Sequence, residues 1–173
     1  MKLSALIIIV FALFLTGESG WGQVNKPGPK KARAPEDYKP RTFKELDEIV
    51  SDADLGDKQE RLMVHGNILP SRVRATFVGS PRPLPELKTE VIRQWARLYA
   101  GNPEHYTKPY HNEMLFEEAG TNHWIAIPER LLSKLTEGLK QGDIVDLFLI
   151  RLGKARQGAE WQSVLLLESF EKF

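Results

Sequence analysis

Three histidines and two glutamates lie close together in the middle of the chain, where they could form a metal or catalytic site. His105, His111 and His123 are accompanied by Glu113 and Glu117. Imidazole and carboxylate groups bind a metal ion when at least three of them converge in space. The histidines are separated by six and twelve residues, across an expected loop and hairpin, and this spacing does not fix convergence. We therefore predict neither a metal site nor a cofactor.

Paired carboxylates would be the second route to chemistry. Glycoside hydrolysis needs two carboxyl groups roughly 5–9 Å apart. Glu113 and Glu117 are too distant, because four residues along a strand span about 13 Å. Asp146 interrupts an apolar strand and is either exposed at an edge or buried with a partner; we expect exposure. We predict no catalytic residue, but a secreted hydrolase using His105, His111 and Glu113 remains the alternative.

Aromatic side chains in the same region offer a binding site. Tyr106, Tyr110, His111 and Trp124 could line a groove, because aromatic faces with polar tips suit sugars, peptides or nucleobases. In the competing interpretation, Trp124 belongs to the core and the tyrosines fix a loop, since large aromatic side chains are mostly buried. We name these four residues as the predicted ligand-binding set.

Composition and motifs narrow the function classes. The 173 residues include 24 Lys and Arg and 23 Asp and Glu, so the net charge of +1 makes nucleic acid an unlikely partner. Cysteine is absent, which excludes disulfides and thiol chemistry. The sequence contains no phosphate-binding glycine loop, GxSxG, HExxH or CxxC motif. These absences favour a non-enzymatic protein.

The first 22 residues have the pattern of a signal peptide. An apolar run extends from Ala5 to Leu15, and Gly20 and Gly22 stand where small residues precede a cleavage point. The run is shorter than the roughly 20 residues that span a bilayer. We therefore predict cleavage after Gly22 and a secreted or periplasmic protein. Membrane contact would come only from an uncleaved leader or from the basic segment that follows.

Residues 23–41 are rich in proline and basic side chains and have no apolar periodicity. We interpret them as an extended linker. Contact with anionic lipid or a cell-wall polymer is one role for it, but a solvated spacer is favoured, because a short charged run is usually solvated.

One domain is expected over residues 42–173. A capping box at Thr42 and Glu45 opens a helix at 43–51. Alternating and helical patterns then predict the remaining elements: strands 62–69 and 73–77 as a hairpin, helix 86–100 ended by Gly101, a loop at 102–111, strands 112–118 and 123–127, a helix from Pro128 to Gly142, and strands 144–152 and 161–170 as a long hairpin.

This order predicts an α+β fold with about six strands and two to three helices. Short connections favour antiparallel pairing. We expect a small bent antiparallel sheet or an OB-like barrel, with an open sheet covered by helices on one face as the alternative. The prediction for function is a non-enzymatic binding or accessory module of the cell envelope. Its partner would be an envelope protein, a polysaccharide or a peptide.

Overall fold

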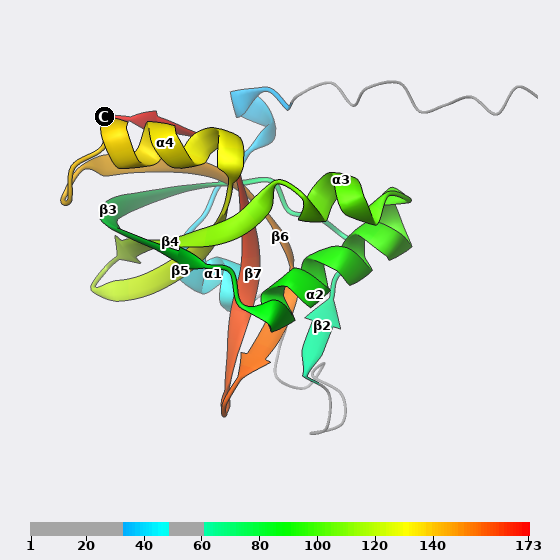
Figure 1. The fold of residues 1–173 in the computed structure, drawn as a ribbon. Coiled ribbons are helices and arrows are strands. Elements are labelled where there is room, and N and C mark those ends of the chain that lie inside the picture. The colour runs from blue at the N-terminus through cyan, green and yellow to red at the C-terminus, as the bar shows by residue number, and fades with distance from the viewer. Residues whose placement is uncertain (1–32, 49–60) are drawn as a thin grey trace, which may run out of the picture. The chain divides into compact units, whose positions relative to one another are not determined.

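The computed structural model describes residues 33–48 and 61–173, and the folded unit runs from Arg33 to Phe173 (Figure 1). The expected leader and the last three residues of the helix expected at 43–51 lie outside the described residues. The fold is mixed, with one seven-stranded sheet and four α-helices among the described residues. The elements are η1 (Pro35–Asp37), β1 (Lys39–Pro40), α1 (Phe43–Glu48), β2 (Leu62–Val64), β3 (Ser71–Pro83), α2 (Glu86–Trp95), the π-helical turn η3 (Ala96–Ala100), α3 (Pro103–Thr107), β4 (Tyr110–Glu118), β5 (Thr121–Pro128), α4 (Glu129–Gly138), β6 (Ile144–Gln157) and β7 (Glu160–Lys172).

Residues 33–41, the described part of the segment expected to be a linker, contain η1 and β1. β1 pairs in parallel with β3. Tyr38 is only 6% exposed and packs edge-on against Phe148, with 5.2 Å between the ring centroids. One aromatic ring and a short strand attach this proline-rich segment to the sheet, and neither produces an apolar periodicity that a sequence pattern could reveal.

Strand order in the sheet is β1-β3-β4-β5-β7-β6-β2, and β3 also pairs with β6. Most neighbours are antiparallel, but β1 pairs with β3 in parallel and β5 meets β7 in parallel at Ala126 and Leu166. The expected hairpin between strands 62–69 and 73–77 is wrong, because β2 pairs with β6. A strand of three residues carries too little pattern to specify its partner. The long hairpin of β6 and β7 is confirmed.

The helix expected at 86–100 is formed by α2 and η3 and ends before Gly101, as expected. Gly101 has φ +70°, the left-handed conformation that glycine adopts without strain. The expected loop at 102–111 is wrong in part, because it contains the short helix α3. The Asn102 side chain accepts a hydrogen bond from the backbone N–H of His105, and Pro103 begins the helix. These are ordinary start signals for a helix, but five residues give no apolar stripe.

Two apolar clusters lie on opposite faces of the sheet strands. The inner core includes Met114 and Phe116 of β4, which are both fully buried. Helix α4 adds Leu131 and Leu135 to it. This helix ends at Gly138 rather than Gly142.

The outer core contains the remaining apolar cluster, beneath α2 and η3. Its members include Val91, Ile92 and Trp95 of α2 and Ile150 and Leu166 of the sheet. Because successive strand residues point to opposite faces, β4 to β7 contribute side chains to both cores. In Figure 1, α2 and α3 stand beside β6 and β7, and α4 lies apart from these two helices.

Helix α1 contacts β5 and β7. The Phe43 ring stacks on His123 of β5 with 4.2 Å between centroids, and Ser163 of β7 donates a hydrogen bond to Asp47. Among the described residues, β5 and β7 share a single paired position, so α1 covers part of the sheet where backbone pairing is sparse.

Asp146 is buried, so the expected edge exposure is wrong. Its carboxylate accepts hydrogen bonds from Arg74 at 2.9 and 3.2 Å, and its side chain is 7% exposed. The two residues face each other across the β3–β6 pairing. Burial is therefore tolerated because a cation on the neighbouring strand compensates the charge.

Candidate functional site

A hollow of about 280 Å³ opens between α2, the end of α3 and the first residues of β4. Two of the four predicted ligand-binding residues, Tyr110 and His111, belong to its wall. The full lining consists of Leu84, Thr89, Arg93, Thr107, Lys108, Tyr110 and His111. The hollow thus draws on three elements joined by short connections.

Hydrogen bonds within these elements fix the wall. The Leu84 backbone N–H donates to the carbonyl of His111 at 2.8 Å, which ties the strand end before α2 to β4. Both threonine hydroxyls donate to carbonyls of their own helices, Thr89 to Pro85 at 3.3 Å and Thr107 to Pro103 at 3.0 Å. The lining is therefore largely formed before a ligand arrives, as is usual for small-molecule sites.

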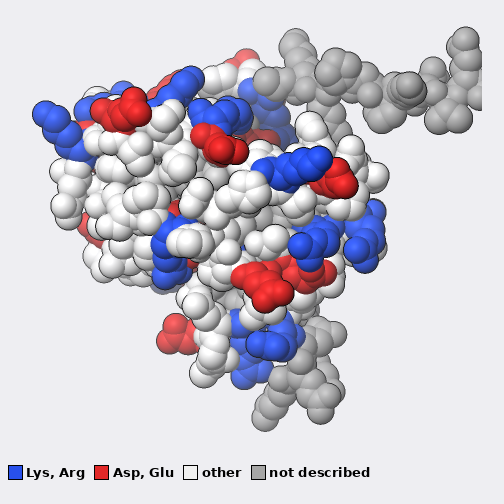
Figure 2. All heavy atoms as spheres, in the orientation of Figure 1, with Lys and Arg blue, Asp and Glu red and all other residues white. Residues whose placement is uncertain are grey.

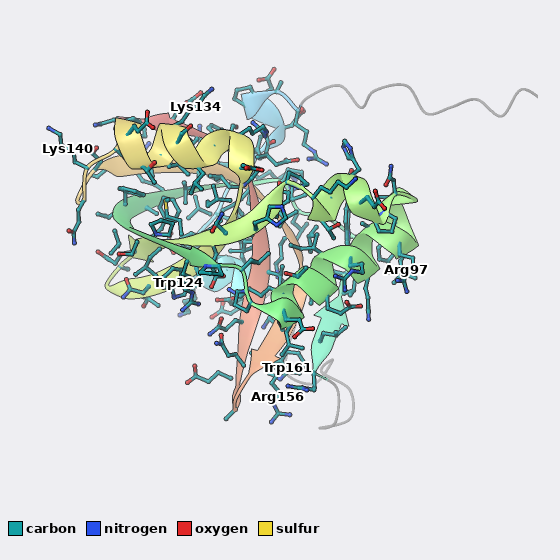
Figure 3. All side chains as sticks on the ribbon, viewed as in Figure 1. Arg97, Trp124, Lys134, Lys140, Arg156 and Trp161 are labelled. Carbon is teal, nitrogen blue, oxygen red and sulfur yellow. The ribbon has the colours of Figure 1, made fainter. Side chains whose placement is uncertain are left out.

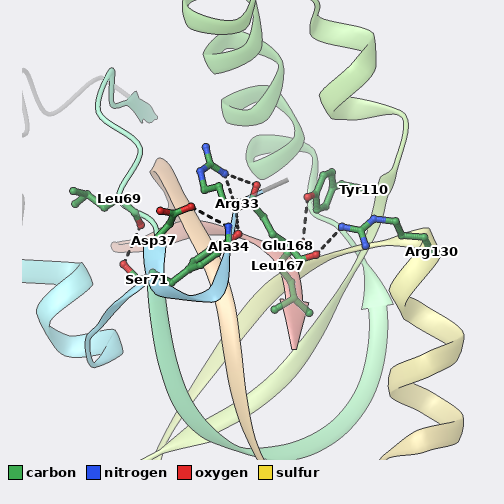
Figure 4. A network of polar contacts seen from close by, with 10 residues as sticks. Arg33, Ala34, Asp37, Leu69, Ser71, Tyr110, Arg130, Leu167 and Glu168 are labelled. Carbon is green, nitrogen blue, oxygen red and sulfur yellow. Dashed lines mark hydrogen bonds and ion pairs between the residues drawn. The ribbon is translucent and has the colours of Figure 1, made fainter. Parts of the chain in front are cut away.

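Tyr110 is a rigid, uncharged part of the wall. It is 9% exposed, and its hydroxyl donates to the Leu167 carbonyl at 3.3 Å. Burial raises the pKa of the Tyr110 phenol, so the group stays protonated. Figure 4 shows this contact next to Arg130, whose guanidinium donates to the Glu168 carbonyl at 2.6 Å.

The charged side chains that line the hollow are basic. Arg93 also pairs with Glu90, and Lys108 pairs with Glu104 at 3.0 Å, in each case within one helical turn. Figure 2 shows such basic and acidic side chains next to each other over α2 and α3. Both pairs are solvent-exposed, and pairs of this kind contribute at most about 1 kcal/mol.

The structure separates the other two predicted residues from the hollow. Tyr106 packs edge-on against Trp95, 5.0 Å between centroids, at the margin of the outer core. Trp124 is half-buried on β5, away from α3 (Figure 3), and the Arg82 guanidinium lies 3.6 Å from its ring centroid. Tyr110 and His111 are therefore the only predicted pair that shares one surface among the described residues.

Sequence reasoning missed a buried ion cluster around Glu113. The Glu113 carboxylate is fully buried and accepts hydrogen bonds from Arg82 Nε and Lys88 Nζ, each at 2.6 Å. Burial lowers the pKa of Lys88, and the neighbouring Glu113 offsets part of that effect. The cluster joins β3, α2 and β4 beside the hollow. One signal was available: Glu113 alternates with the inward-facing Met114, which places it on the face that α2 covers.

The residues named for the alternative hydrolase have different roles in the structure. Both Glu113 oxygens are engaged by cations, and His105 packs edge-on against Tyr106 rather than lining the hollow. Of the three residues named for the hydrolase, His111 alone is exposed and lines the hollow. Within residues 33–48 and 61–173, no three His, Asp or Glu side chains are grouped to hold a metal ion.

A second polar network fastens the N-terminal end of the folded unit. Arg33 donates to both Glu168 oxygens at 2.6 Å, and the Tyr38 hydroxyl donates to the same carboxylate at 2.7 Å (Figure 4). Burial and this hydrogen bond raise the pKa of Tyr38 to about 12. Since Leu167 precedes Glu168, the network adjoins the residue that anchors Tyr110.

Comparison with protein-family models finds no match, and comparison with curated protein sequences finds no significant similarity. No helix in the described part of the chain is both long and apolar enough to cross a bilayer.

Proposed function

We propose that this chain is an exported, non-enzymatic binding module of the cell envelope. The module is built on an OB-like barrel and uses the hollow at Tyr110 and His111 to hold one residue or end group of an envelope peptide or polysaccharide. The observation that carries the proposal is the hollow itself, which combines an apolar wall with a few polar and basic groups and is lined by two of the residues predicted to bind ligand.

Strand pairing supports the OB-like barrel. Each strand pairs with the next in the order β3, β4, β5, β7 and β6, and β6 also pairs with β3, the first strand of this order. Five strands joined in this way, with α4 between β5 and β6, fit the plan of a small, partly open barrel. The sparse β5–β7 pairing is the position at which such a barrel would be open.

The size and chemistry of the hollow support binding rather than catalysis. Its volume of about 280 Å³ is at the lower limit of ligand pockets, which suits one sugar or one amino-acid residue. The nearby carboxylate that could have served as a general acid or base, Glu113, is held between two cations. The leader pattern over residues 1–22 supports export, and with it an envelope ligand.

Thermal unfolding of the full chain with a panel of envelope fragments tests the proposal. Short peptides and oligosaccharides from the envelope of the native host form the panel. A ligand present at 100 times its Kd stabilises the folded state by about 2.7 kcal/mol, which raises Tm by several degrees. The same ligand should have a much smaller effect on His111→Ala.

Trp124→Ala serves as the matched control, because Trp124 lies outside the hollow, and it should keep the response to ligand. A panel without any effect on the wild-type chain, or an effect that survives in His111→Ala and disappears in Trp124→Ala, would refute the hollow as the ligand site. N-terminal sequencing from the native host tests export separately, with a start near Gln23 expected.

A further inference from the structure

We infer that the hollow binds an oxyanion, a carboxylate or a phosphate monoester, at the end of its ligand, and that Arg93 and Lys108 are the residues that hold it. This inference rests on the proposed function and adds the chemical class of the ligand. It starts from the charge of the lining: two cationic side chains face the hollow and no carboxylate lines it.

The two cations approach the hollow from different elements. Arg93 comes from the last turn of α2, and Lys108 follows the last residue of α3. His111, at the start of β4, adds an imidazole that can donate from either ring nitrogen, depending on tautomer. An anion in the hollow would therefore be contacted from three directions, whereas a neutral group would leave two cations facing it.

The competing acidic groups are weak rivals for these cations. Glu104 and Lys108 are each 76% exposed, whereas in the second pair Arg93 is 44% and Glu90 29% exposed, so Lys108 has the weaker rival. Exchanging such a partner for a ligand anion costs little, because exposed ion pairs are screened by water and salt. Neither Glu90 nor Glu104 lines the hollow itself.

The hydroxyl groups in the wall already donate to the protein backbone, so the cations are the main hydrogen-bond donors available to a ligand. Thr89, Thr107 and Tyr110 each donate their hydroxyl hydrogen to a backbone carbonyl. The arginine fork, which is planar and carries parallel N–H groups, matches the two oxygens of a carboxylate or phosphate. Arg93 thus supplies direction and Lys108 supplies charge.

NMR titration of the ¹⁵N-labelled full chain tests the inference with acetate and inorganic phosphate as separate probes at constant ionic strength. At least one probe should shift the amide signals of residues around the hollow, with a Kd on the order of millimolar for so small a ligand. Binding of acetate alone identifies a carboxylate end group, and binding of phosphate identifies a phosphate monoester.

The double variant Arg93→Gln/Lys108→Gln should weaken binding at least tenfold. The matched control Arg97→Gln/Lys134→Gln removes the same charge from exposed positions outside the hollow, both labelled in Figure 3, and should stay within twofold of wild type. Because all four side chains are exposed, both double variants should fold, and unchanged thermal unfolding without ligand checks this. Arg93→Lys keeps the charge without the fork and should fall between the two.

Equal weakening in both double variants would reduce the effect to net charge and overturn the inference, as would the absence of shifts with either probe. The proposed function has a separate outcome. If a neutral envelope fragment raises Tm through His111 while both anions fail to bind, the binding module stands and only the oxyanion is wrong. If the anions bind but no envelope fragment does, the oxyanion site stands and the proposed binding of an envelope fragment is wrong.

Discussion

The inner and outer cores differ in the kind of side-chain contact that holds their elements together. The inner core, around Phe116 and Leu147, consists of apolar side chains. The outer core, between the sheet and α2, is equally apolar at Ile92, but ends beside the fully buried carboxylate of Glu113 and its partner Lys88. An apolar contact is non-directional, whereas an ion cluster requires one fixed arrangement of its groups.

This difference explains why the candidate site lies beside the outer core. The Glu113 cluster fixes α2 on β4 in a single position, and Thr89 and Arg93 on the same helix then line the hollow. Binding groups need such rigid support to hold their geometry. We therefore expect changes in the inner core to leave the hollow in place, and loss of the cluster to weaken the attachment of α2 to β4.

The largest effect is expected in the inner core. Phe116→Ala should lower the free energy of unfolding by about 4 kcal/mol, because it removes a fully buried ring and leaves a cavity. Denaturant unfolding of the full chain measures it. Phe173→Ala, at a position 68% exposed, is the control and should cost under about 1 kcal/mol. Similar losses for the two variants would contradict the described inner core.

A smaller but still large loss is expected at the ion cluster. Glu113→Gln should cost about 3 kcal/mol, because it leaves the Lys88 ammonium buried without its counter-charge. The control is Glu48→Gln, which removes an exposed pair with Lys44 and should cost about 0.5 kcal/mol. The two variants can be compared by denaturant unfolding at pH 7.

The two regions should also differ in ligand response. Phe116→Ala, if folded at low temperature, should keep the affinity of the hollow, whereas Glu113→Gln should lose it at least in part. Intact binding in Glu113→Gln would show that the cluster does not support the hollow.

The N-terminal network should give an intermediate effect with a characteristic pH dependence. Tyr38→Phe should cost about 2 kcal/mol at pH 7, because the lost hydrogen bond has a charged acceptor, Glu168. The pKa of Tyr38 is raised from 10.0 to about 12, so the folded chain keeps a proton that the unfolded chain releases between these values. Stability should therefore fall as pH rises from 10 to 12.

Tyr38→Phe should reduce this alkaline slope, which denaturant unfolding at pH 9 and pH 11 can measure. Tyr110, whose pKa is also raised, should preserve the remaining slope. An unchanged slope in the variant would contradict the buried position of the Tyr38 hydroxyl.

The smallest effect is expected at the contact of α1 with β5. Burial lowers the pKa of His123 from 6.5, so below that pH the unfolded chain takes up a proton more readily than the folded chain. Stability should fall modestly as pH decreases from 7 to 5. His123→Phe, which can retain the stacking on Phe43, should show a shallower decline in the same range, measured by denaturant unfolding. An equal decline would assign the acid sensitivity to other groups, including His65.

Local patterns predicted the elements that carry their own periodicity. Alternating and helical patterns predicted β4 and the helix over 86–100, and Gly101 marked the end of that helix. Pairings between distant segments could not be read in the same way. The β3–β6 register brings Arg74 to Asp146, and only this long-range contact explains a buried aspartate.

The candidate site was predictable only in part, for the same reason. Tyr110 and His111 are neighbours in the sequence, and the structure keeps them in one wall. Arg93 lies on another element, and only the packing of α2 on β4 brings it to them. Trp124 was a reasonable candidate by residue type, but the Arg82 guanidinium covers one face of its ring and it does not line the hollow.

Ligand should enter the hollow beside α2. The most direct measurement is amide NMR mapping on the full chain with the envelope fragment that gives the largest rise in Tm. We predict that the largest shifts fall at Thr89, Lys108 and His111, with small changes at Trp124. Largest shifts around Trp124, or at the ends of β6 and β7 away from α2, would contradict the assignment of the site.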